Sequence, residues 1–241
     1  MSNNRFLKFK IIIFYCILII VLNGSFKLLP LHSQGEKRKP LVSFCFDDNC
    51  MRQAPILTSK GVKGTICFVI NWIKPGDLEK MHVLEDEGWE IASHSVTHSK
   101  EPESEYRDSK NYLKERGFNV TGFVYPGGGA TAQHEEWARK YYEWARDVVT
   151  YKVGYTHYDR LCNHPPINPY HLLGCHSAGH SLKEYQNIVD YVERSGDWVI
   201  FYTHGHTDEI SDEDLSRLID YIQAKNIDIL PIREALKIYG N

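Results

Sequence analysis

Five side chains that can bind a metal or move a proton stand at the ends of apolar segments of the chain, or within one helical turn of them. Each segment has the length and the aromatic or β-branched composition of a buried strand. If these strands are parallel, their carboxyl ends converge on one face, so that residues far apart in sequence meet there. The five side chains are Asp47, Asp48, His94, His98 and His204.

The residue types fit a catalytic metal site. One aspartate and two histidines supply oxygen and nitrogen ligands and leave positions open for water and substrate, a pattern typical of catalytic rather than structural zinc. The second aspartate is then free to act as a base. Each element alone is a weak signal, because neighbouring aspartates usually form a solvated turn and a His-x-x-x-His pair is usually incidental. Their joint position at strand ends, where an unpaired carboxylate is costly, gives them weight.

Strands and helices alternate from residue 41 onward. The expected strands are 41–46, 65–70, 90–93, 120–125, 148–153, 197–202 and 228–230, with a short one at Leu172. The expected helices are 53–60, 77–87, 104–116, 135–147, 232–238 and two more whose first turns are capped by Ser181 with Glu184 and by Ser211 with Asp214. This alternation predicts an α/β fold with a parallel sheet, either doubly wound or closed. The seven or eight units, without a Gly-rich phosphate loop after the first strand, favour a barrel.

Four segments carry a resemblance to a known family. They are Ser43–Asn49 (SFCFDDN), Ile91–His98 (IASHSVTH), Phe123–Gly128 (FVYPGG) and Ile200–His204 (IFYTH). They resemble the motifs of the polysaccharide deacetylases with a NodB homology domain, which are enzymes like those of carbohydrate esterase family 4. The resemblance runs from about residue 41 to the C-terminus and implies a distorted, incomplete (β/α) barrel with about seven parallel strands.

The resemblance also implies a role for each strand-end residue and for four of their neighbours. The catalytic residues are Asp47 as general base, His204 as proton donor to the leaving group, and Gly127, whose backbone N–H binds the oxyanion. The metal ligands are Asp48, His94 and His98, and the cofactor is a divalent metal, expected to be zinc. The expected substrate-binding residues are Tyr125, Pro126 and Tyr202. Aromatic residues such as these, and Trp72 and Trp198, are more often core than sugar platforms, although one or two can line a groove.

The chain departs from the family pattern in four places, one of which is Gly127 in place of the tyrosine that commonly follows the proline of the third motif. Val124 stands where the third motif often has an arginine that pairs with the catalytic aspartate. Asn49 replaces a usual glycine, which the tolerance of asparagine for left-handed backbone angles permits. The fourth motif, which contains an aspartate, has no clear counterpart, because Asp159 is a poor match. Since that aspartate normally orients the missing arginine, we expect the two absences to be linked.

These observations predict a metal-dependent hydrolase that removes acetyl groups, expected to be N-acetyl, from a polysaccharide partner and releases acetate. Two alternatives remain open: an O-acetyl esterase acting on a xylan-like polymer, and a non-catalytic secreted carbohydrate-binding protein on the same fold. A structural metal domain is disfavoured because only three ligands are evident. A second metal is disfavoured because five other histidines lack convincing ligand spacing: His157, His164, His171, His176 and His180.

Charge and the N-terminal segment limit the partners and the location. The formal net charge of −3 gives no basic footprint, so we expect no nucleic-acid partner. Three basic residues precede an unbroken apolar run at 11–22, which has the proportions of a signal-peptide core and is short for a membrane span. We therefore divide the chain into a signal peptide or membrane anchor (1–25), a linker (26–40) and a deacetylase domain (41–241). Either form of the first segment predicts export: secreted, periplasmic or anchored at the outer face of the membrane.

The cysteines give a weaker indication. Five of the six cysteines lie in the expected domain, and an odd number cannot all pair. Cys162 and Cys175 flank a loop-like stretch and are the best candidates for a disulfide. Packing of all five as reduced thiols agrees equally well with the sequence.

Overall fold

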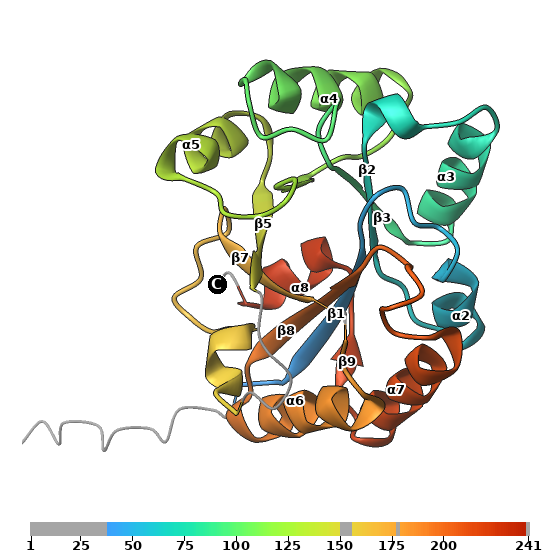
Figure 1. Ribbon diagram of the computed structural model, residues 1–241, viewed down its shortest axis with the longest axis vertical. Helices are drawn as coiled ribbons and strands as arrows, with labels where there is room; N and C mark the ends of the chain where they lie inside the picture. The colour runs from blue at the N-terminus through green and yellow to red at the C-terminus, as the bar shows by residue number, and fades with distance from the viewer. Residues whose placement is uncertain (1–37, 150–155, 177–178, 240–241) are drawn as a thin grey trace, which may run out of the picture. The chain divides into compact units, whose positions relative to one another are not determined.

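Seven parallel strands close into a barrel in the computed structural model, which describes residues 38–149, 156–176 and 179–239 (Figure 1). The strands are β1 (Leu41–Phe46), β2 (Thr65–Phe68), β3 (Glu90–Ser93), β4 (Gly122–Val124), β5 (Trp144–Val149), β7 (Leu172–His176) and β8 (Trp198–Thr203). The barrel closes where β1 pairs with β8 along its whole length, from Leu41 opposite Trp198 to Phe46 opposite Thr203. The prediction of a (β/α) barrel with about seven parallel strands is confirmed.

The barrel is distorted at the amino-terminal ends of its strands. Because β8 occupies one edge of β1, β2 and the short β9 (Asp228–Ile229) share the other edge. There β2 pairs with the C-terminal residues of β1, Cys45 and Phe46, while β9 pairs with its first residues, Leu41 and Val42. A two-residue strand, β6 (Cys162–Asn163), runs antiparallel to β8. The carboxyl ends of the main strands, which carry the candidate site, are therefore the regularly closed end.

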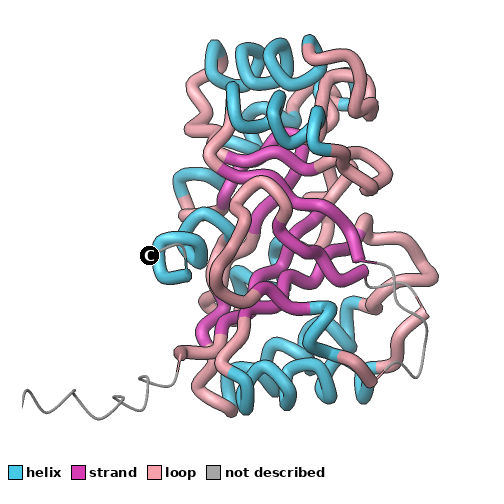
Figure 2. The backbone as a smooth tube through the Cα atoms, turned by 90° about the vertical axis from the view of Figure 1, so that its left-hand side faces the viewer, coloured by secondary structure: helices cyan, strands magenta, loops and turns pink. Residues whose placement is uncertain are grey.

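Helices surround the barrel, and Figure 2 shows the strands lying between them. They are α2 (Ala54–Ser59), α3 (Asp77–Asp86), α4 (Ser104–Glu115), α5 (Ala132–Tyr141), α6 (Leu182–Ser195), α7 (Asp212–Ala224), α8 (Ile232–Tyr239) and the 3₁₀ turns η1 (Ile70–Trp72) and η2 (Tyr158–Leu161). The capping residues Ser181 and Ser211 precede α6 and α7 as predicted. In α6 the buried residues recur at helical spacing, which turns one apolar face toward the barrel: Tyr185, Ile188, Val189 and Val192. None of the described helices is both long and apolar enough to cross a bilayer.

Alternation along the strands divides the core into two parts. In β1, Val42, Phe44 and Phe46 pack with the helices, whereas Leu41 and Cys45 belong to a second cluster inside the barrel. Other members of the inner cluster come from each of the remaining barrel strands: Cys67, Ala92, Val124, Trp144, Leu172, Trp198, Ile200 and Tyr202. Residues on both faces of the strands are therefore largely buried, and for this reason β1 and β8 read as mainly apolar runs.

One element prediction is wrong. The helix expected at 135–147 ends at Tyr141, and Trp144–Val149 forms β5 instead. The sequence of this segment suits a helix, but Trp144 and Arg146 are fully buried inside the barrel. Gly122, opposite Trp144 in register, leaves room for the indole, because a Cβ there would lie 1.9 Å from Trp144 Cζ2. Burial of these large side chains outweighs the local helix propensity.

Two further predictions concern a disulfide and the N-terminal segment. The disulfide proposed between Cys162 and Cys175 is not formed: both residues are buried thiols that pack in the core between the barrel and the helices. The signal peptide or anchor predicted at 1–25, and nearly all of the linker predicted at 26–40, lie outside the described residues.

Candidate active site

The carboxyl ends of β1 and β3 bring the three predicted metal ligands together. Oδ1 of Asp48 lies 3.4 Å from Nε2 of His94 and 3.5 Å from Nε2 of His98. Ligand atoms that each lie about 2.1 Å from one tetrahedral zinc ion are about 3.4 Å apart, so these separations fit a shared ion. Oδ1 of Asp48 is also buried and has no hydrogen-bond partner among the described residues, a costly state that a bound cation would relieve.

Neighbouring groups orient the two imidazole ligands. Nδ1 of His94 donates a hydrogen bond to the carbonyl oxygen of Val124 at 2.8 Å, which leaves Nε2 with its lone pair on the side of Asp48. The ring of His98 stacks on Trp72 with centroids 5.1 Å apart. Asp48 and His98 have φ angles of 55° and 65°, in the left-handed region that residues other than glycine rarely adopt. Strain of this kind tends to persist at functional sites.

The local charges favour the protonation states that metal binding requires. Burial acts to raise the pKa of Asp48, but the neighbouring imidazoles of His94 and, after it, His98 hold it below its usual value. Burial, followed by the neighbouring His94, lowers the pKa of His98. An ionised carboxylate and a neutral imidazole are the forms that bind a metal.

Asp47 points into the barrel and pairs with an arginine from a distant part of the sequence. Nη2 of Arg146, on β5, lies 2.5 Å from Oδ2 of Asp47, and both side chains are buried. Burial acts to raise the pKa of Asp47, but the charges of Arg146, His94 and His204 hold it below its usual value. Arg146 is the register partner of Val124, the position where the family motif often has its arginine. The charge missing from β4 is therefore supplied by the neighbouring strand.

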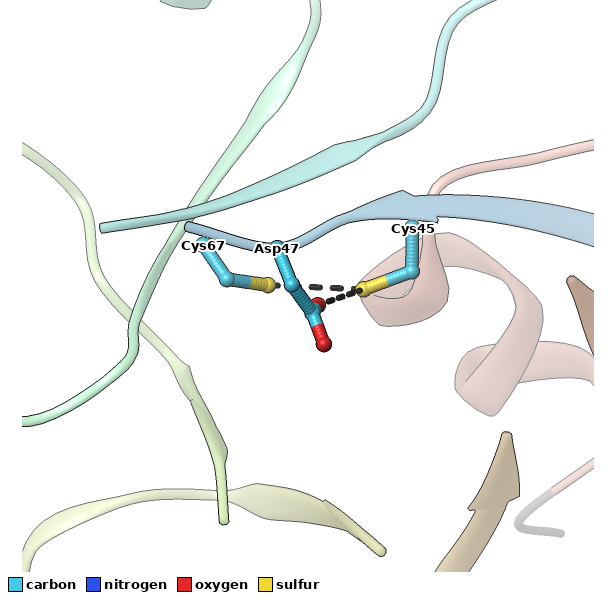
Figure 3. Close-up of side chains that lie close together, drawn as sticks. All are labelled: Cys45, Asp47 and Cys67. Atoms are coloured by element: carbon cyan, nitrogen blue, oxygen red, sulfur yellow. Dashed lines mark hydrogen bonds between the residues drawn. The ribbon is translucent and has the colours of Figure 1, made fainter. Parts of the chain in front are cut away.

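Two thiols lie beside Asp47 inside the barrel (Figure 3). Sγ of Cys45 lies 3.7 Å from Oδ1 of Asp47 and 3.3 Å from Sγ of Cys67. The spacing of these three side chains would suit a metal. However, burial, followed by Cys45, raises the pKa of Cys67 well above its usual value, and Arg146 already occupies the carboxylate of Asp47. Since a thiol must lose its proton to bind a metal, these residues form part of the barrel core.

His204 follows β8 and is held by a carboxylate that sequence reasoning missed. Nδ1 of His204 lies 2.6 Å from Oε1 of Glu209, and the backbone N–H of His204 donates to Oε2 of Glu209 at 2.7 Å. Thr203 and His176 also donate to Glu209, at 2.6 and 3.0 Å. Burial acts to lower the pKa of His204, but the hydrogen bond and charge of Glu209, with the charge of Asp47, raise it above its usual value. The arrangement favours a protonated imidazole.

Gly127 begins a tight glycine turn after β4. Gly127, Gly128 and Gly129 all have positive φ angles between 64° and 67°, which glycine adopts readily. The backbone N–H of Gly127 has no acceptor among the described residues, so it is open to a substrate oxygen. Asp147, another residue missed from the sequence, fixes the turn by accepting hydrogen bonds from the N–H groups of Gly129 and Ala130 at 2.7 and 2.8 Å.

The three predicted substrate-binding residues are all buried. Tyr125 is enclosed in the core, and its hydroxyl donates to the carbonyl oxygen of Tyr170 at 2.9 Å. Pro126 is buried as well. Tyr202 packs against the guanidinium of Arg146, 4.2 Å from the ring centroid, and stacks on His176. These side chains pack in the core next to the site, and neither tyrosine ring is exposed enough to stack on a sugar.

An open trench of about 690 Å³ runs beside the metal-ligand cluster. Its lining joins Asp48 and His204 to residues of the segments that follow β1 and β2. The lining residues with charged or aromatic side chains include Asp48, Arg52, Trp72, Lys74, Lys80 and His204. Of the aromatic residues considered from the sequence, Trp72 is the one that reaches this trench, and 43% of its surface is exposed.

Three positioning residues, Arg146, Asp147 and Glu209, were not identified from the sequence. Arg146 and Asp147 were assigned to a helix, although the β-branched run that follows them is a signal that the strand begins earlier. Glu209 lies five positions after His204 in a polar loop, where a carboxylate is unremarkable. Its significance depends on the turn that folds it back onto the histidine, which the sequence does not reveal.

A family comparison agrees with the resemblance over the first three of the four motif segments. A family model described as polysaccharide deacetylase matches residues 34–142. This range contains the three predicted metal ligands, Asp47 and Gly127, and ends before Arg146, Asp147, His204 and Glu209. No curated protein matches the chain in sequence.

Solved structures resemble the fold at low sequence identity. A family 4 acetyl xylan esterase from Clostridium thermocellum, in complex with a cobalt ion, has a TM-score of 0.54 and 14% identity, covering 82% of this chain and 91% of that one. The catalytic domain of a peptidoglycan N-acetylglucosamine deacetylase from Eubacterium rectale has a TM-score of 0.51 and 15% identity, covering 82% and 90%. A 4-alpha-glucanotransferase from Thermococcus litoralis has a TM-score of 0.60 and 13% identity, covering 83% of this chain but 40% of that enzyme. At such identities the likeness establishes the fold and leaves the chemistry to the site.

Proposed function

We propose, on the premise that this chain carries a polysaccharide deacetylase domain, that it hydrolyses N-acetyl groups on a polysaccharide with the help of a divalent metal. The observation that carries this proposal is the convergence of Asp48, His94 and His98 on one point beside the buried Asp47–Arg146 pair. Metal ligands and a separate acid–base group within one site are what metal-assisted hydrolysis requires.

In the proposed reaction, Asp48, His94 and His98 hold the cation, with zinc as the expected ion. A divalent cation in this position supplies Lewis acidity toward water and the acetyl carbonyl. The combination of one carboxylate and two imidazoles suits zinc, and it also suits other divalent transition metals. The ion should therefore be identified by reconstitution with single metals.

Asp47 accepts the proton of the attacking water. Arg146 keeps this carboxylate ionised in the interior of the barrel and binds its Oδ2, which leaves Oδ1, beside the Cys45 thiol, to accept the proton. The oxyanion that forms on the carbonyl oxygen of the acetyl group is stabilised by the backbone N–H of Gly127, in a turn held by Asp147.

His204 donates a proton to the departing group. Glu209 accepts from Nδ1 of His204, so that the proton available for transfer is on Nε2. The raised pKa of His204 supports the amide rather than the ester as substrate, because an amine leaves only when it is protonated, whereas an alcohol needs less help. An O-acetyl esterase acting on a xylan-like polymer is the second candidate, and the likeness to an acetyl xylan esterase favours it at the level of the fold.

Acetate release from matched substrates tests the proposal. The purified domain is stripped with a chelator, reloaded with one divalent metal at a time, and supplied with N-acetylglucosamine oligomers or with acetylated xylan oligomers. We expect metal-dependent acetate release, with the N-acetyl substrate preferred, and its loss in Asp47→Asn but not in the matched surface variant Asp86→Asn. Faster release from xylan would favour the esterase. Metal and glycan binding without any release of acetate would favour a carbohydrate-binding protein.

We also propose that the domain is exported. Support comes from the basic residues and the apolar run at 11–22, whose proportions suit a signal peptide. Fractionation of cells that produce the full chain should find the protein outside the cytoplasm. Full-length soluble protein in the cytosol would contradict this proposal, and the mass of the mature protein would distinguish a cleaved signal from an anchor.

A further inference from the structure

The trench beside the metal-ligand cluster is more basic than the protein as a whole. Its lining contains three cationic side chains, Arg52, Lys74 and Lys80, in a chain whose formal net charge is −3. Two of them already have partners: Arg52 binds Asp212 with both N–O distances at 2.7 Å, and Lys80 lies 3.5 Å from Asp77. Lys74 makes no ion pair in the part of the chain that the structure describes.

Asp77 offsets one of these cations, Lys80, and leaves the charge of Lys74 uncompensated. Its carboxylate is largely buried and accepts a hydrogen bond from the backbone N–H of Lys74 at 2.8 Å, which fixes the loop that carries the lysine. The ammonium groups of Lys74 and Lys80 thus flank a trench that has one buried acid on the same side. The remaining acid of the lining, Asp48, belongs to the metal-ligand cluster. The free charge of the trench is therefore positive.

Trp72 gives the trench a rigid aromatic wall. It ends η1, which is tied to the segment after β3 by hydrogen bonds from the N–H groups of Ile70 and Asn71 to Ser95 and Val96 at 3.1 and 3.0 Å. Its indole stacks on His98, so the ring is held next to a metal ligand, yet 43% of the residue is exposed. A fixed, half-exposed ring beside a reaction centre presents apolar area at little cost in conformational entropy.

We propose that this trench is a subsite for an anionic sugar: the unit next to the acetylated sugar packs against Trp72 while its carboxylate or phosphate group pairs with Lys74 and Lys80. The inference rests on the proposed deacetylase function and names its substrate class as an acidic polysaccharide. The ring and the two ammonium groups line the same trench as Asp48 and His204, so a polymer that places its acetyl group at the metal continues past them. Ammonium groups bind either anion as point charges.

Binding measured without turnover tests the subsite apart from the chemistry. The metal-loaded Asp47→Asn variant is titrated calorimetrically with oligosaccharides of equal length: neutral N-acetylglucosamine oligomers, hyaluronan fragments that carry a carboxylate on alternate sugars, and phosphorylated N-acetylglucosamine oligomers. We expect at least one anionic series to bind about 5–10-fold more tightly than the neutral one, with a preference that shrinks as salt rises. The comparison of the two anionic arms shows which group is recognised. Equal affinity for all three series would overturn the proposal.

Side-chain variants assign the preference to the trench. In the same Asp47→Asn background, Lys74→Gln should remove most of the anionic preference and leave neutral binding unchanged, while Lys114→Gln, an exposed lysine on α4, should change neither. A preference that survives Lys74→Gln combined with Lys80→Gln would place the anion elsewhere and refute this assignment.

The ring requires its own control because it contacts a metal ligand. Trp72→Ala should weaken binding of every oligosaccharide about 3–10-fold, and Trp72→Phe should restore part of the loss. Metal content measured for both variants shows whether His98 still binds. If both variants retain metal and neither changes oligosaccharide affinity, the proposed packing of a sugar against Trp72 is wrong. The protein with Asp47 intact separates the two proposals. Binding of anionic oligosaccharides without release of acetate would refute the proposed deacetylase function and leave the subsite standing. Release of acetate without a preference for anionic oligosaccharides would refute the subsite and leave the function standing.

Discussion

Replacement of Arg146 by methionine should destabilise the barrel severely, and removal of the charge on Asp47 should largely reverse the loss. Both side chains are buried, with 0% and 2% of their surfaces exposed, and the ion pair is 2.5 Å long. Methionine fills much of the volume of the arginine stem, so the main effect of Arg146→Met is a buried carboxylate without its partner. The thiol of Cys45, 3.7 Å away, is a weak donor and cannot replace the guanidinium.

The size of the effect follows from this environment. Loss of one partner of a buried ion pair costs about 3–5 kcal/mol, and loss of the contact with Tyr202, 4.2 Å from the guanidinium, adds about 0.5–1 kcal/mol. A loss of about 4 kcal/mol lowers the melting temperature of a domain of this size by roughly 8–16 °C. In the double variant Arg146→Met with Asp47→Asn no charge is left unpaired, so we expect at least about 2 kcal/mol to be recovered.

Urea denaturation of all four proteins, followed by tryptophan fluorescence in the presence of a chelator, measures the complete cycle. The chelator removes the contribution of metal binding to the free energy of unfolding. Asp47→Asn alone should be milder than Arg146→Met, because the amide oxygen still accepts a hydrogen bond from the guanidinium. If the losses in the free energy of unfolding of the two single variants simply add in the double variant, the double variant is less stable than either one. That result would refute the idea that each charge stabilises the other.

Three further outcomes are expected at the same end of the barrel. Asp48→Asn should lose metal and activity together, whereas Asp47→Asn should retain metal, measured by elemental analysis, and lose about 10²–10⁴ in rate. In Glu209→Gln, loss of the negative partner lowers the pKa of His204, so its protonated form disappears at a lower pH; the alkaline limb of the kcat/KM profile should move to lower pH. Gly128→Ala should cost about 2–4 kcal/mol in urea denaturation, because its φ is 64° and the new Cβ would lie 2.0 Å from a β5 side chain.

Two of these outcomes have a matched control variant, and the third has a result that would contradict it. Asp86→Asn removes an exposed aspartate from α3 and should change neither metal content nor rate. Gly76→Ala places a Cβ at a positive φ of 83° with nothing within 4 Å, so it reports backbone strain alone and should cost less than Gly128→Ala. An alkaline limb that stays in place in Glu209→Gln would mean that His204 is not the group that titrates there.

Most of the alternation of strands and helices could be predicted because strands such as β1 and β8 are buried on both faces. Leu41–Phe46 and Trp198–Thr203 are continuous apolar runs followed at once by polar residues, so the strand ends and the residues beyond them stood out together. Once strands are parallel, the meeting of Asp48 with His94 follows from topology. The metal cluster was therefore within reach of sequence reasoning.

The supporting residues were out of reach because their significance is set by contacts across the barrel. Arg146 has a charged side chain in a segment of good helix formers, and nothing local indicates that it is buried against Asp47, 99 positions away. Tyr125 and Tyr202 were assigned to the substrate because they adjoin catalytic motifs, yet strand alternation and packing turn both rings into the core. Local patterns predict which residues form a strand more reliably than what each side chain touches.

The pairing of Val124 with Arg146 has a consequence for how sequence motifs are compared between barrels of this kind. Inside a closed barrel, residues that are register partners on adjacent strands lie at the same height along the barrel axis. Their inward-pointing side chains can therefore reach the same point. A linear motif specifies which strand carries the charged residue, whereas the chemistry depends on the position of the charged group in the site. A chain can thus fail a motif at one position and satisfy the site from the strand beside it. When a barrel lacks a catalytic partner at its motif position, the register partners of that position on the adjacent strands should be inspected before the partner is considered lost.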